Sequence, residues 1–315
     1  MTDRLLSLCI PMHNEEHNIS ALHEALTTVL RSIPGHAYEI ICVDDGSTDR
    51  TLHHLHQLAD IDTHVRVIEL SRNFGKEAAL TAALDHAIGD AIIPFDADLQ
   101  DPVELIPELV DTWRKGADVV LARRTDRSAD SYFKRKTAQI FYSIHNNLSA
   151  LKIPHNVGDF RLMDRRVVDA VRQLPERQRF LKGIFAYAGF KAATIDYKRI
   201  QRHAGESKFS GWRLWNFALE GITSFSTAPL RIWLYLGAFG AMASLVYATF
   251  IIIYTLSHGA DVPGYASLLV AVIFFGSIQL IGIGILGEYI GRIYMETKQR
   301  PTYIIRSSYR RSDST

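Results

Sequence analysis

The sequence predicts an α/β domain with a mostly parallel sheet, followed by two helices long enough to cross a membrane. Up to about Pro229, apolar β-rich runs alternate with helical stretches, which is typical of a sheet built from strand–helix repeats. Two later runs, 232–257 and 262–287, contain no charged residue. Each exceeds the roughly 20 residues that a helix needs to span a bilayer. Polar clusters also follow directly after the first four apolar runs.

The first part of the chain contains five predicted strands, with a helix after each of the first four. We expect the strands at 5–12, 38–44, 65–70, 90–96 and 117–123, and the helices at 19–32, 51–59, 77–86 and 103–115. The strands are apolar along nearly their whole length, so the sheet should be parallel and covered by helices on both faces. Ligands of such sheets bind at the carboxyl ends of the strands, which is where PMHNEE, DDGSTD, SRNFGK and DADLQD lie.

The segment FDADLQDP, 95–102, places three carboxylates directly after a buried run. On a continuing strand, Asp96 and Asp98 would share one face and repel each other. A fold accepts that repulsion where a cation lies between the carboxylates, or avoids it where the strand has already ended. Asp101 has a separate explanation, because it is expected to be the N-cap of the next helix, with Pro102 at the first helical position.

Composition and local motifs exclude several classes of function. The net charge of +1, from 35 basic and 34 acidic residues, gives no support to a nucleic-acid partner. Cys9 and Cys42 lie in separate buried runs, which favours a reducing compartment over a disulfide framework.

GIGILG, 282–287, matches a dinucleotide fingerprint in letters but lies inside an apolar run, so close helix packing explains it better. NFGK, 73–76, lacks the other residues of a P-loop.

The charges around the apolar runs predict their orientation. The connector HGADVPG, 258–264, has no Lys or Arg, whereas basic residues lie on the outer flanks. These residues are Arg231, Arg292, Lys298, Arg300, Arg306, Arg310 and Arg311. The positive-inside rule therefore places both flanks, the α/β domain and both termini in the cytoplasm.

We divide the chain accordingly into 1–209, 210–229, 230–292 and 293–315. The first part is the α/β domain and the last is a basic cytoplasmic tail. The third holds the two spans, at about 231–257 and 264–288. The aromatic-rich segment 210–229 predicts an amphipathic helix at the membrane interface, and a helix packed on the α/β domain is the alternative.

Six motifs occur in a characteristic order along the chain. They are PMHNEE, VDDGSTD, SRNFGKEAAL, FDADLQDP, VGDFRLMDR and AGESKFSGW. With the paired spans, the sequence resembles the polyprenyl-phosphate glycosyltransferases, a family with a GT-A fold that includes the dolichyl-phosphate mannose synthases. The ending LGEYIGRIY…RPTYII is most similar to the bactoprenol glucosyltransferases of O-antigen modification. The resemblance covers almost the whole chain.

The resemblance implies an inverting transfer of glucose from UDP-glucose to undecaprenyl phosphate at the cytoplasmic face of a bacterial inner membrane. UDP-GlcNAc, UDP-aminoarabinose and GDP-mannose remain alternative donors, and a membrane-anchored nucleotide-sugar sensor without turnover is the alternative of another class. A processive polysaccharide synthase is excluded, because no Q-x-x-R-W motif is present and two spans are too few for a polymer channel. Family habit and the glycine-rich spans favour a homo-oligomer, with a tetramer possible.

The resemblance also implies a metal site at DAD, which matches the family's DxD motif. Asp98 would bind Mg²⁺ or Mn²⁺ directly with help from Gln100, and Asp96 would lie nearer the nucleotide or a metal-bound water. Such ions prefer hard oxygen ligands and keep several waters, so one or two carboxylates and the donor's phosphates suffice.

The remaining site residues follow from the matching motifs. The donor pocket would contain Pro11, His13, Glu15, Asp44, Asp45 and Lys76, together with Asp96 and Gln100. The acceptor phosphate would meet Arg123, Arg202, Ser207 and Lys208, with Arg123 also acting in catalysis. Asp159 would contact the sugar or orient the attack, with a role as base as the alternative. Turn formation remains an alternative for Asp44 and Asp45, and a solvated surface position for Lys76.

Overall fold

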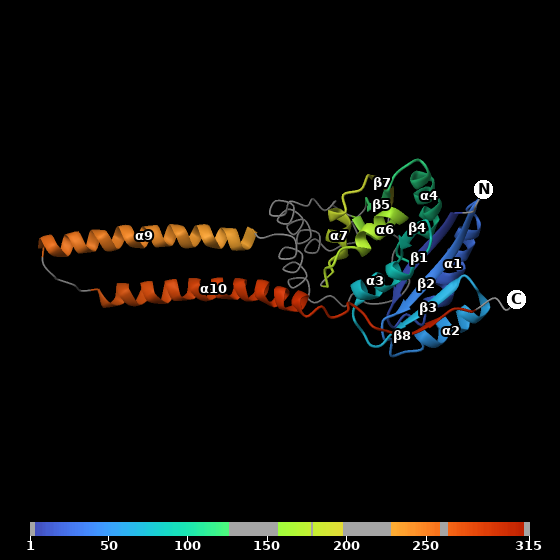
Figure 1. The fold of residues 1–315 in the computed structure, drawn as a ribbon, viewed down its shortest axis with the longest axis horizontal. Helices are drawn as coiled ribbons and strands as arrows, with labels where there is room; N and C mark the ends of the chain where they lie inside the picture. The colour runs from blue at the N-terminus through green and yellow to red at the C-terminus, as the bar shows by residue number, and fades with distance from the viewer. Residues whose placement is uncertain (1–3, 126–156, 178, 198–227, 259–263, 312–315) are drawn as a thin grey trace.

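The computed structural model describes residues 4–125, 157–177, 179–197, 228–258 and 264–311. These residues form an α/β domain and a pair of long C-terminal helices (Figure 1). The strands are β1 (Arg4–Met12), β2 (His36–Asp44), β3 (Val65–Leu70), β4 (Ala91–Pro94), β5 (Val119–Arg124), β6 (Val157–Asp164), β7 (Ala192–Tyr197) and β8 (Ile305–Tyr309). The helices of the domain are α1 (Ile19–Arg31), α2 (Thr51–Ile61), α3 (Lys76–His86), α4 (Ile106–Arg114), α6 (Arg165–Arg172) and α7 (Leu181–Tyr187).

The strands form one sheet in the order β7-β5-β6-β4-β1-β2-β3-β8. β1, β2, β3 and β4 pair in parallel, and β5 pairs with β7 in parallel. β6 runs antiparallel between β4 and β5, and β8 runs antiparallel along β3. The predicted α/β fold with a mostly parallel, GT-A-like sheet is therefore confirmed. The five predicted strands are present, whereas the sequence did not point to β6, β7 or β8.

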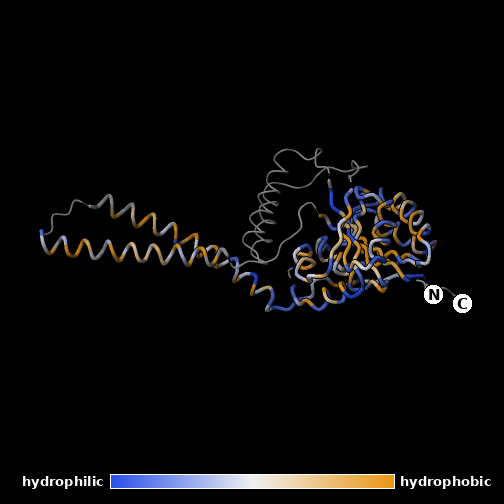
Figure 2. Tube along the Cα trace, turned by 90° about the horizontal axis from the view of Figure 1, so that it is seen from above, coloured by the Kyte–Doolittle hydropathy of each residue, from blue (hydrophilic) through white to orange (hydrophobic). Residues whose placement is uncertain are grey.

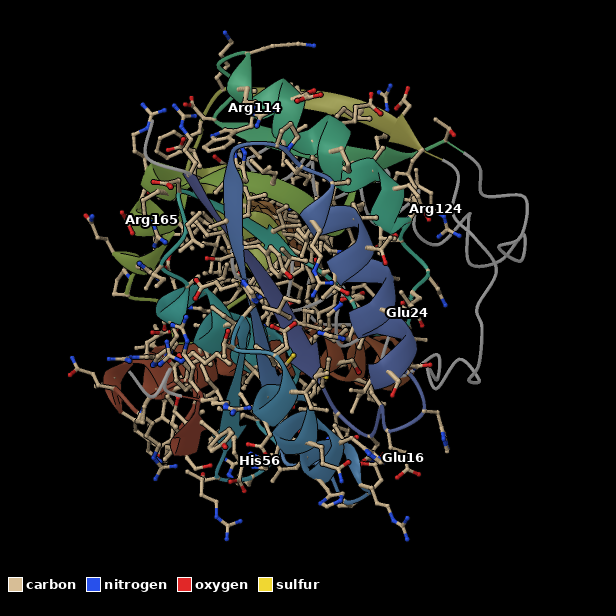
Figure 3. All side chains as sticks on the ribbon, turned by 90° about the vertical axis from the view of Figure 1, so that its right-hand side faces the viewer. Glu16, Glu24, His56, Arg114, Arg124 and Arg165 are labelled. Atoms are coloured by element: carbon tan, nitrogen blue, oxygen red, sulfur yellow. The ribbon has the colours of Figure 1, made fainter. Side chains whose placement is uncertain are left out.

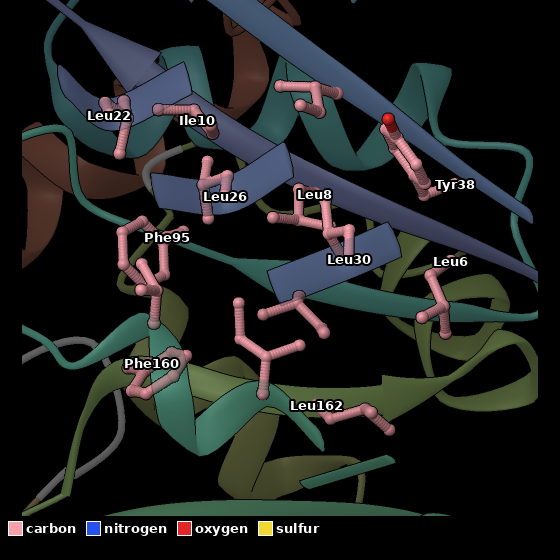
Figure 4. Packing of buried hydrophobic residues seen from close by; sticks show 14 of the residues in the cluster. Leu6, Leu8, Ile10, Leu22, Leu26, Leu30, Tyr38, Phe95, Phe160 and Leu162 are labelled. Carbon is pink, nitrogen blue, oxygen red and sulfur yellow. The ribbon is translucent and has the colours of Figure 1, made fainter. Parts of the chain in front are cut away.

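The core lies on both faces of the sheet because the strands are apolar on both. On one face, Leu22, Leu26 and Leu30 of α1 pack over Leu8 and Ile10 of β1 (Figure 4). Their spacing of four residues keeps them on one side of the helix. On the other face, α3 presents a buried run, 78–84, that consists of alanines and leucines apart from Thr81. The short alanine side chains let α3 lie close to the sheet, and this position fixes the residues at its first turn.

The segment after β4 differs from its prediction in one respect. β4 ends at Pro94, so Asp96 and Asp98 lie in a loop and not on a shared strand face. Asp101 is not a helix N-cap, because a 3-10 turn, η1 (Val103–Leu105), precedes α4 without a side-chain cap. The buried Asp101 carboxylate instead accepts a hydrogen bond from the Tyr197 hydroxyl at 2.5 Å. Asp101 thus ties this loop to β7.

The C-terminal helices are α9 (Ala228–His258) and α10 (Tyr265–Thr297). Both are long and apolar enough to cross a membrane, by length and composition. Figure 2 shows hydrophobic residues along most of both helices, whereas those of the domain gather in its interior. The predicted spans, 231–257 and 264–288, lie within these helices apart from Gly264, and their crossing of a membrane stays a prediction. The predicted interfacial segment 210–229 lies outside the described residues apart from its last two positions.

One glycine of GIGILG has a clear packing role. A Cβ at Gly282 would lie 2.1 Å from the Trp233 side chain of α9, so a larger residue there would force this ring to shift. This contact supports the interpretation of the motif as small residues for helix packing. A Cβ at Gly287 or Gly291 would meet nothing within 4 Å.

Candidate active site

The four predicted polar clusters follow β1, β2, β3 and β4, whose parallel pairing brings their carboxyl ends to one edge of the sheet. Figure 3 shows Glu16, in the loop after β1, and Arg124, at the end of β5, on one side of the domain. Arg165, beside the amino end of β4, lies toward the opposite side (Figure 3). The candidate active site is therefore the edge formed by the loops after these strands.

The centre of this edge is an ion-pair cluster around Lys76, the first residue of α3. The Lys76 Nζ lies 2.7 Å from Asp96 Oδ1 and 2.9 Å from Asp159 Oδ2. Asp96 comes from the loop after β4, and Asp159 comes from β6. One ammonium group thus joins three elements that are far apart in the sequence. Lys76, Asp96 and Asp159 were all predicted site residues, and the structure places them in direct contact.

The cluster strongly shifts the pKa values of its members. Burial disfavours the charged form of Lys76, but Asp96 and Asp159 outweigh it and hold the lysine pKa well above its usual range. Burial would raise the pKa of Asp159, but the cations of Lys76 and Lys182 outweigh it and hold that pKa well below its usual range. Asp159 is therefore ionised at neutral pH and is a weak proton acceptor.

A second network joins the loops after β2 and β3. The Asp45 carboxylate accepts hydrogen bonds from the backbone N–H groups of Phe74 (2.7 Å) and Gly75 (2.9 Å). His13 Nδ1 lies 3.0 Å from the Asp45 carbonyl oxygen and 3.2 Å from the Asn73 side-chain nitrogen. His13 and Asp45 are thus brought together, and Asp45 holds the loop that leads into Lys76.

Asp44 lies beneath this network, at the end of β2. Its side chain is buried, and Oδ2 accepts the Ser47 backbone N–H at 3.2 Å. Within the described residues, the buried Oδ1 atom has no hydrogen-bond partner. Burial raises the pKa of Asp44, and the Ser47 hydrogen bonds partly offset this effect. A buried acceptor without a partner is costly, so this atom suits a donor group of a ligand.

Gly46 allows these loops to approach each other. Its φ of +64° is favoured by glycine, and a Cβ would lie 2.6 Å from backbone atoms of Arg72 and Asn73. We expect Gly46→Ala to push the loop after β3 away and to weaken the Asp45 hydrogen bonds. The donor KM should rise about tenfold or more, with a loss of roughly 1–3 kcal/mol in unfolding free energy.

Gly35→Ala is the matched control for this experiment, because Gly35 has a φ of +71° and its Cβ would meet nothing within 4 Å. Steady-state kinetics and thermal unfolding of both variants separate the effect of the contact from that of the backbone conformation. Equal donor KM values in the two variants would contradict a role for the contact at Gly46.

The DAD loop continues with a tight turn. Leu99 has a φ of +52°, a conformation that non-glycine residues rarely adopt. Asp98 Oδ1 accepts the backbone N–H of the buried Gln100 at 3.2 Å. This turn orients the Asp98 carboxylate after the strand has ended. A direct side-chain role of Gln100 toward a metal stays a prediction.

The other predicted residues lie less centrally. Pro11 is part of β1 beside Val43. The Glu15 carboxylate accepts a hydrogen bond from the Asn18 side chain at 2.6 Å, so it is engaged at the start of α1. Roles for Pro11 and Glu15 in the donor pocket stay predictions.

The predicted acceptor residues are only partly described. Arg123 forms a bidentate ion pair with Asp196 across β5 and β7, at 2.6 and 2.9 Å. Its guanidinium is thus already paired with a carboxylate, a partner that the sequence did not suggest. Arg202, Ser207 and Lys208 lie outside the described residues.

Sequence reasoning also missed Glu77. Burial and the neighbouring Asp159 raise the pKa of this carboxyl to about 7, while Lys76 acts in the opposite direction. Glu77 Oε2 is also 3.4 Å from the backbone N–H of Leu181 at the start of α7. The only signal in the sequence was its position beside Lys76 in SRNFGKEAAL.

Comparisons with known proteins identify the family of this chain. Residues 7–172 match the glycosyl transferase family 2 model, and residues 228–293 match the GtrB C-terminal hairpin. The chain is 53% identical over 305 residues to the SfII prophage-derived bactoprenol glucosyl transferase of Shigella flexneri, covering 97% of this chain and 98% of that protein. It is 52% identical to a prophage bactoprenol glucosyl transferase homolog of Escherichia coli K12, covering 96% and 98%.

Among solved structures, the mannosyltransferase PcManGT of Pyrobaculum calidifontis, in complex with GDP-Man and Mn²⁺, is similar with a TM-score of 0.47. The two chains are 16% identical, over 94% of this chain and 86% of that one.

The family model covers more than half of the chain, and the relatives cover nearly all of it. The chain therefore belongs to glycosyl transferase family 2, as a glycosyltransferase with a GtrB-type C-terminal hairpin.

Proposed function

We propose that this enzyme transfers glucose from UDP-glucose to undecaprenyl phosphate, also called bactoprenol phosphate. The main support is the 53% identity, over 97% of the chain, to a protein named a bactoprenol glucosyl transferase. The paired apolar helices would hold the catalytic domain at the membrane that contains the lipid acceptor. The basic flanks favour a cytoplasmic position for the domain and both termini. Homo-oligomerisation stays a prediction.

The nucleotide would bind at the edge formed by the loops after β1 and β2. The Oδ1 atom of Asp44, which has no hydrogen-bond partner among the described residues, would accept a hydrogen bond from a ribose hydroxyl or the uracil N–H. His13 and Asp45 would line the same pocket, because they are joined to the loop that leads to Lys76. This hydrogen bond would favour a nucleotide, because a ligand without a donor group at this point would leave the buried Asp44 oxygen unpaired.

The donor set at DAD suits a divalent cation. Asp98 and Asp96 supply hard carboxylate oxygens from the loop after β4, the type of ligand that Mg²⁺ and Mn²⁺ prefer. Asp98 would hold Mg²⁺ or Mn²⁺ directly, and Asp96 would support it from beside Lys76. When bound, the cation would neutralise charge on the diphosphate and stabilise the departing UDP.

The acceptor needs little help from a general base, because a phosphate monoester is already anionic near neutral pH. The lowered pKa of Asp159 fits this chemistry, since a carboxylate held ionised by Lys76 is a poor base. We assign Asp159 the role of positioning Lys76 and the sugar. A direct attack by the lipid phosphate on the anomeric carbon would form the new C–O bond as the bond to UDP breaks, with inversion at that carbon.

The acceptor phosphate would meet the cationic residues near the domain's membrane side. Arg123 would take part by exchanging its partner Asp196 for the lipid phosphate. Such an exchange is feasible because both side chains of this pair are about half exposed, and exposed ion pairs are weak. Arg202, Ser207 and Lys208 complete the proposed set.

The decisive experiment measures transfer from a panel of radiolabelled nucleotide sugars to undecaprenyl phosphate in membranes. We expect label in the lipid phase from UDP-glucose, and its loss when a chelator removes divalent metal. Transfer from UDP-GlcNAc, UDP-aminoarabinose or GDP-mannose instead would keep the reaction and change the sugar. Donor binding without lipid-linked label from any donor would favour a sensor.

A further inference from the structure

The chain returns to the catalytic domain after its second apolar helix. We call Pro301–Tyr309 the C-terminal strap. Figure 1 shows this segment running from α10 along the edge of the domain to the C-terminus. Its β8 pairs antiparallel with β3, with Ile68 opposite Ser308 and Glu69 opposite Ser307. The sequence predicted a basic tail over 293–315, and within it residues 305–309 of the strap form an edge strand of the sheet.

The strap contacts the base of the loop that carries Lys76. The Ser71 backbone N–H donates to the Ile304 carbonyl oxygen at 2.8 Å, directly before that loop. The Tyr303 hydroxyl donates to Asp85 of α3 at 2.9 Å. The apolar side chains of Tyr303 and Phe74 pack against the same buried cluster as α3. The strap thus contacts the chain at Ser71, before the loop that leads to Lys76, and again at Asp85, near the end of α3.

The strap also contacts a carboxylate beside the proposed nucleotide pocket. Glu69 lies opposite Asp44 in the register of β2 and β3, on the same face of the sheet. The Glu69 carboxylate accepts the Ser307 hydroxyl at 2.8 Å and pairs with Arg306 at 3.2 Å. Strap residues therefore occupy and partly neutralise the acidic neighbour of Asp44.

We propose that the strap is a positioning element of the donor site, in which Arg306 and Ser307 restrain Glu69 beside the Asp44 carboxylate that accepts from the nucleotide. This inference rests on the proposed function, because it takes the nucleotide to bind at Asp44. The strap residues do not touch the reacting atoms. They act through Glu69 and through the loop that begins at Ser71.

The charges around Asp44 give the expected direction of the effect. Burial is the main cause of its raised pKa, Glu69 adds to it, and His13 acts in the opposite direction. Asp45 is a further acidic neighbour. Without Arg306 and Ser307, the Glu69 charge would be less balanced and the pKa of Asp44 would rise further. Donor affinity would then be lost at a higher pH as the solution is acidified.

The strap also links the donor site to the helix pair. It begins shortly after the end of α10 at Thr297. Near that end, both Glu296 carboxylate oxygens accept the Arg177 backbone N–H, at 3.0 and 3.1 Å, in the segment between α6 and α7. The end of α10 is thus joined to the segment between α6 and α7 and, through the strap, to β3.

The test compares two full-length double variants in membranes. Arg306→Gln/Ser307→Ala removes one guanidinium and one hydroxyl beside Glu69. Arg311→Gln/Tyr309→Phe is the matched control, because it removes the same kinds of groups where the end of the strap and Arg311, just beyond it, meet Asp60 at the end of α2. Donor KM, acceptor KM and kcat are measured against pH, with thermal unfolding of each protein.

We expect the first double variant to raise the donor KM about fivefold to tenfold, more at low pH, with little change in acceptor KM. Adding Glu69→Gln should restore the donor KM, because the unbalanced charge is then absent. An unchanged donor KM, an equal effect in the control, or no rescue by Glu69→Gln would overturn the inference. Failure of the wild-type enzyme to transfer from any donor would instead refute the proposed function.

Discussion

Asp98→Ala is expected to abolish transfer, with a loss of about a thousandfold or more in kcat, because it removes the proposed direct ligand of the divalent cation. The leaving UDP would then carry its developing charge without that support. Folding should be preserved, since Asp98 is only half-buried and lies in a loop after β4. Membrane insertion should also be unchanged, because the apolar helices are remote in sequence.

The measurement is transfer of label to undecaprenyl phosphate at saturating donor and added Mg²⁺ or Mn²⁺. Asp111→Ala is a suitable control, since this carboxylate on α4 is 60% exposed and pairs with Arg114 three residues away. We expect the control to retain full activity. Near-normal transfer by Asp98→Ala, with the control also active, would refute the assignment of Asp98 to the metal.

The sequence was informative where short-range pattern decides the structure. Continuous apolar strands and the polar clusters after them predicted the parallel core of the sheet and the edge at which the site lies. The charge-free runs predicted α9 and α10 because the length of a helix relative to a bilayer needs no tertiary information. The spacing of Asp96 and Asp98 indicated a site but not the loop conformation that carries it.

Contacts between distant segments could not be predicted in this way. β8 has the sequence IRSSY, which lacks an apolar alternation, and it becomes a strand because β3 offers it an edge. The local pattern DPVE predicted an N-cap at Asp101, but the Tyr197 hydroxyl takes this carboxylate as a partner. Arg123 was expected to be available for phosphate, and its pairing with Asp196 depends on β7 lying beside β5. Tertiary partners overrode local preference in each case.

Lys76→Met should have the second large effect, with kcat reduced about a hundredfold to a thousandfold. The ammonium of Lys76 lies between Asp96 and Asp159, so its removal leaves two carboxylates beside each other without their cation. Both would lose the orientation that the ion pairs provide. Lys76→Arg should retain more activity than Lys76→Met, because it keeps the charge. Lys115→Met, at an exposed position after α4, is the control for loss of a lysine.

The pH profile of Lys76→Met distinguishes a loss of charge from general damage. Lys76 holds the pKa of Asp159 well below its usual range and also lowers that of Glu77, which is about 7. Without Lys76 both pKa values rise, so at a given pH more of each carboxyl is protonated. If the ionised forms are needed, the residual rate of Lys76→Met must begin to fall at a higher pH than the wild-type rate as the solution is acidified. If the rate is reduced but falls at the same pH as the wild-type rate, Lys76 acts on the donor directly. It then does not maintain the ionised carboxylates, because only that role depends on their protonation.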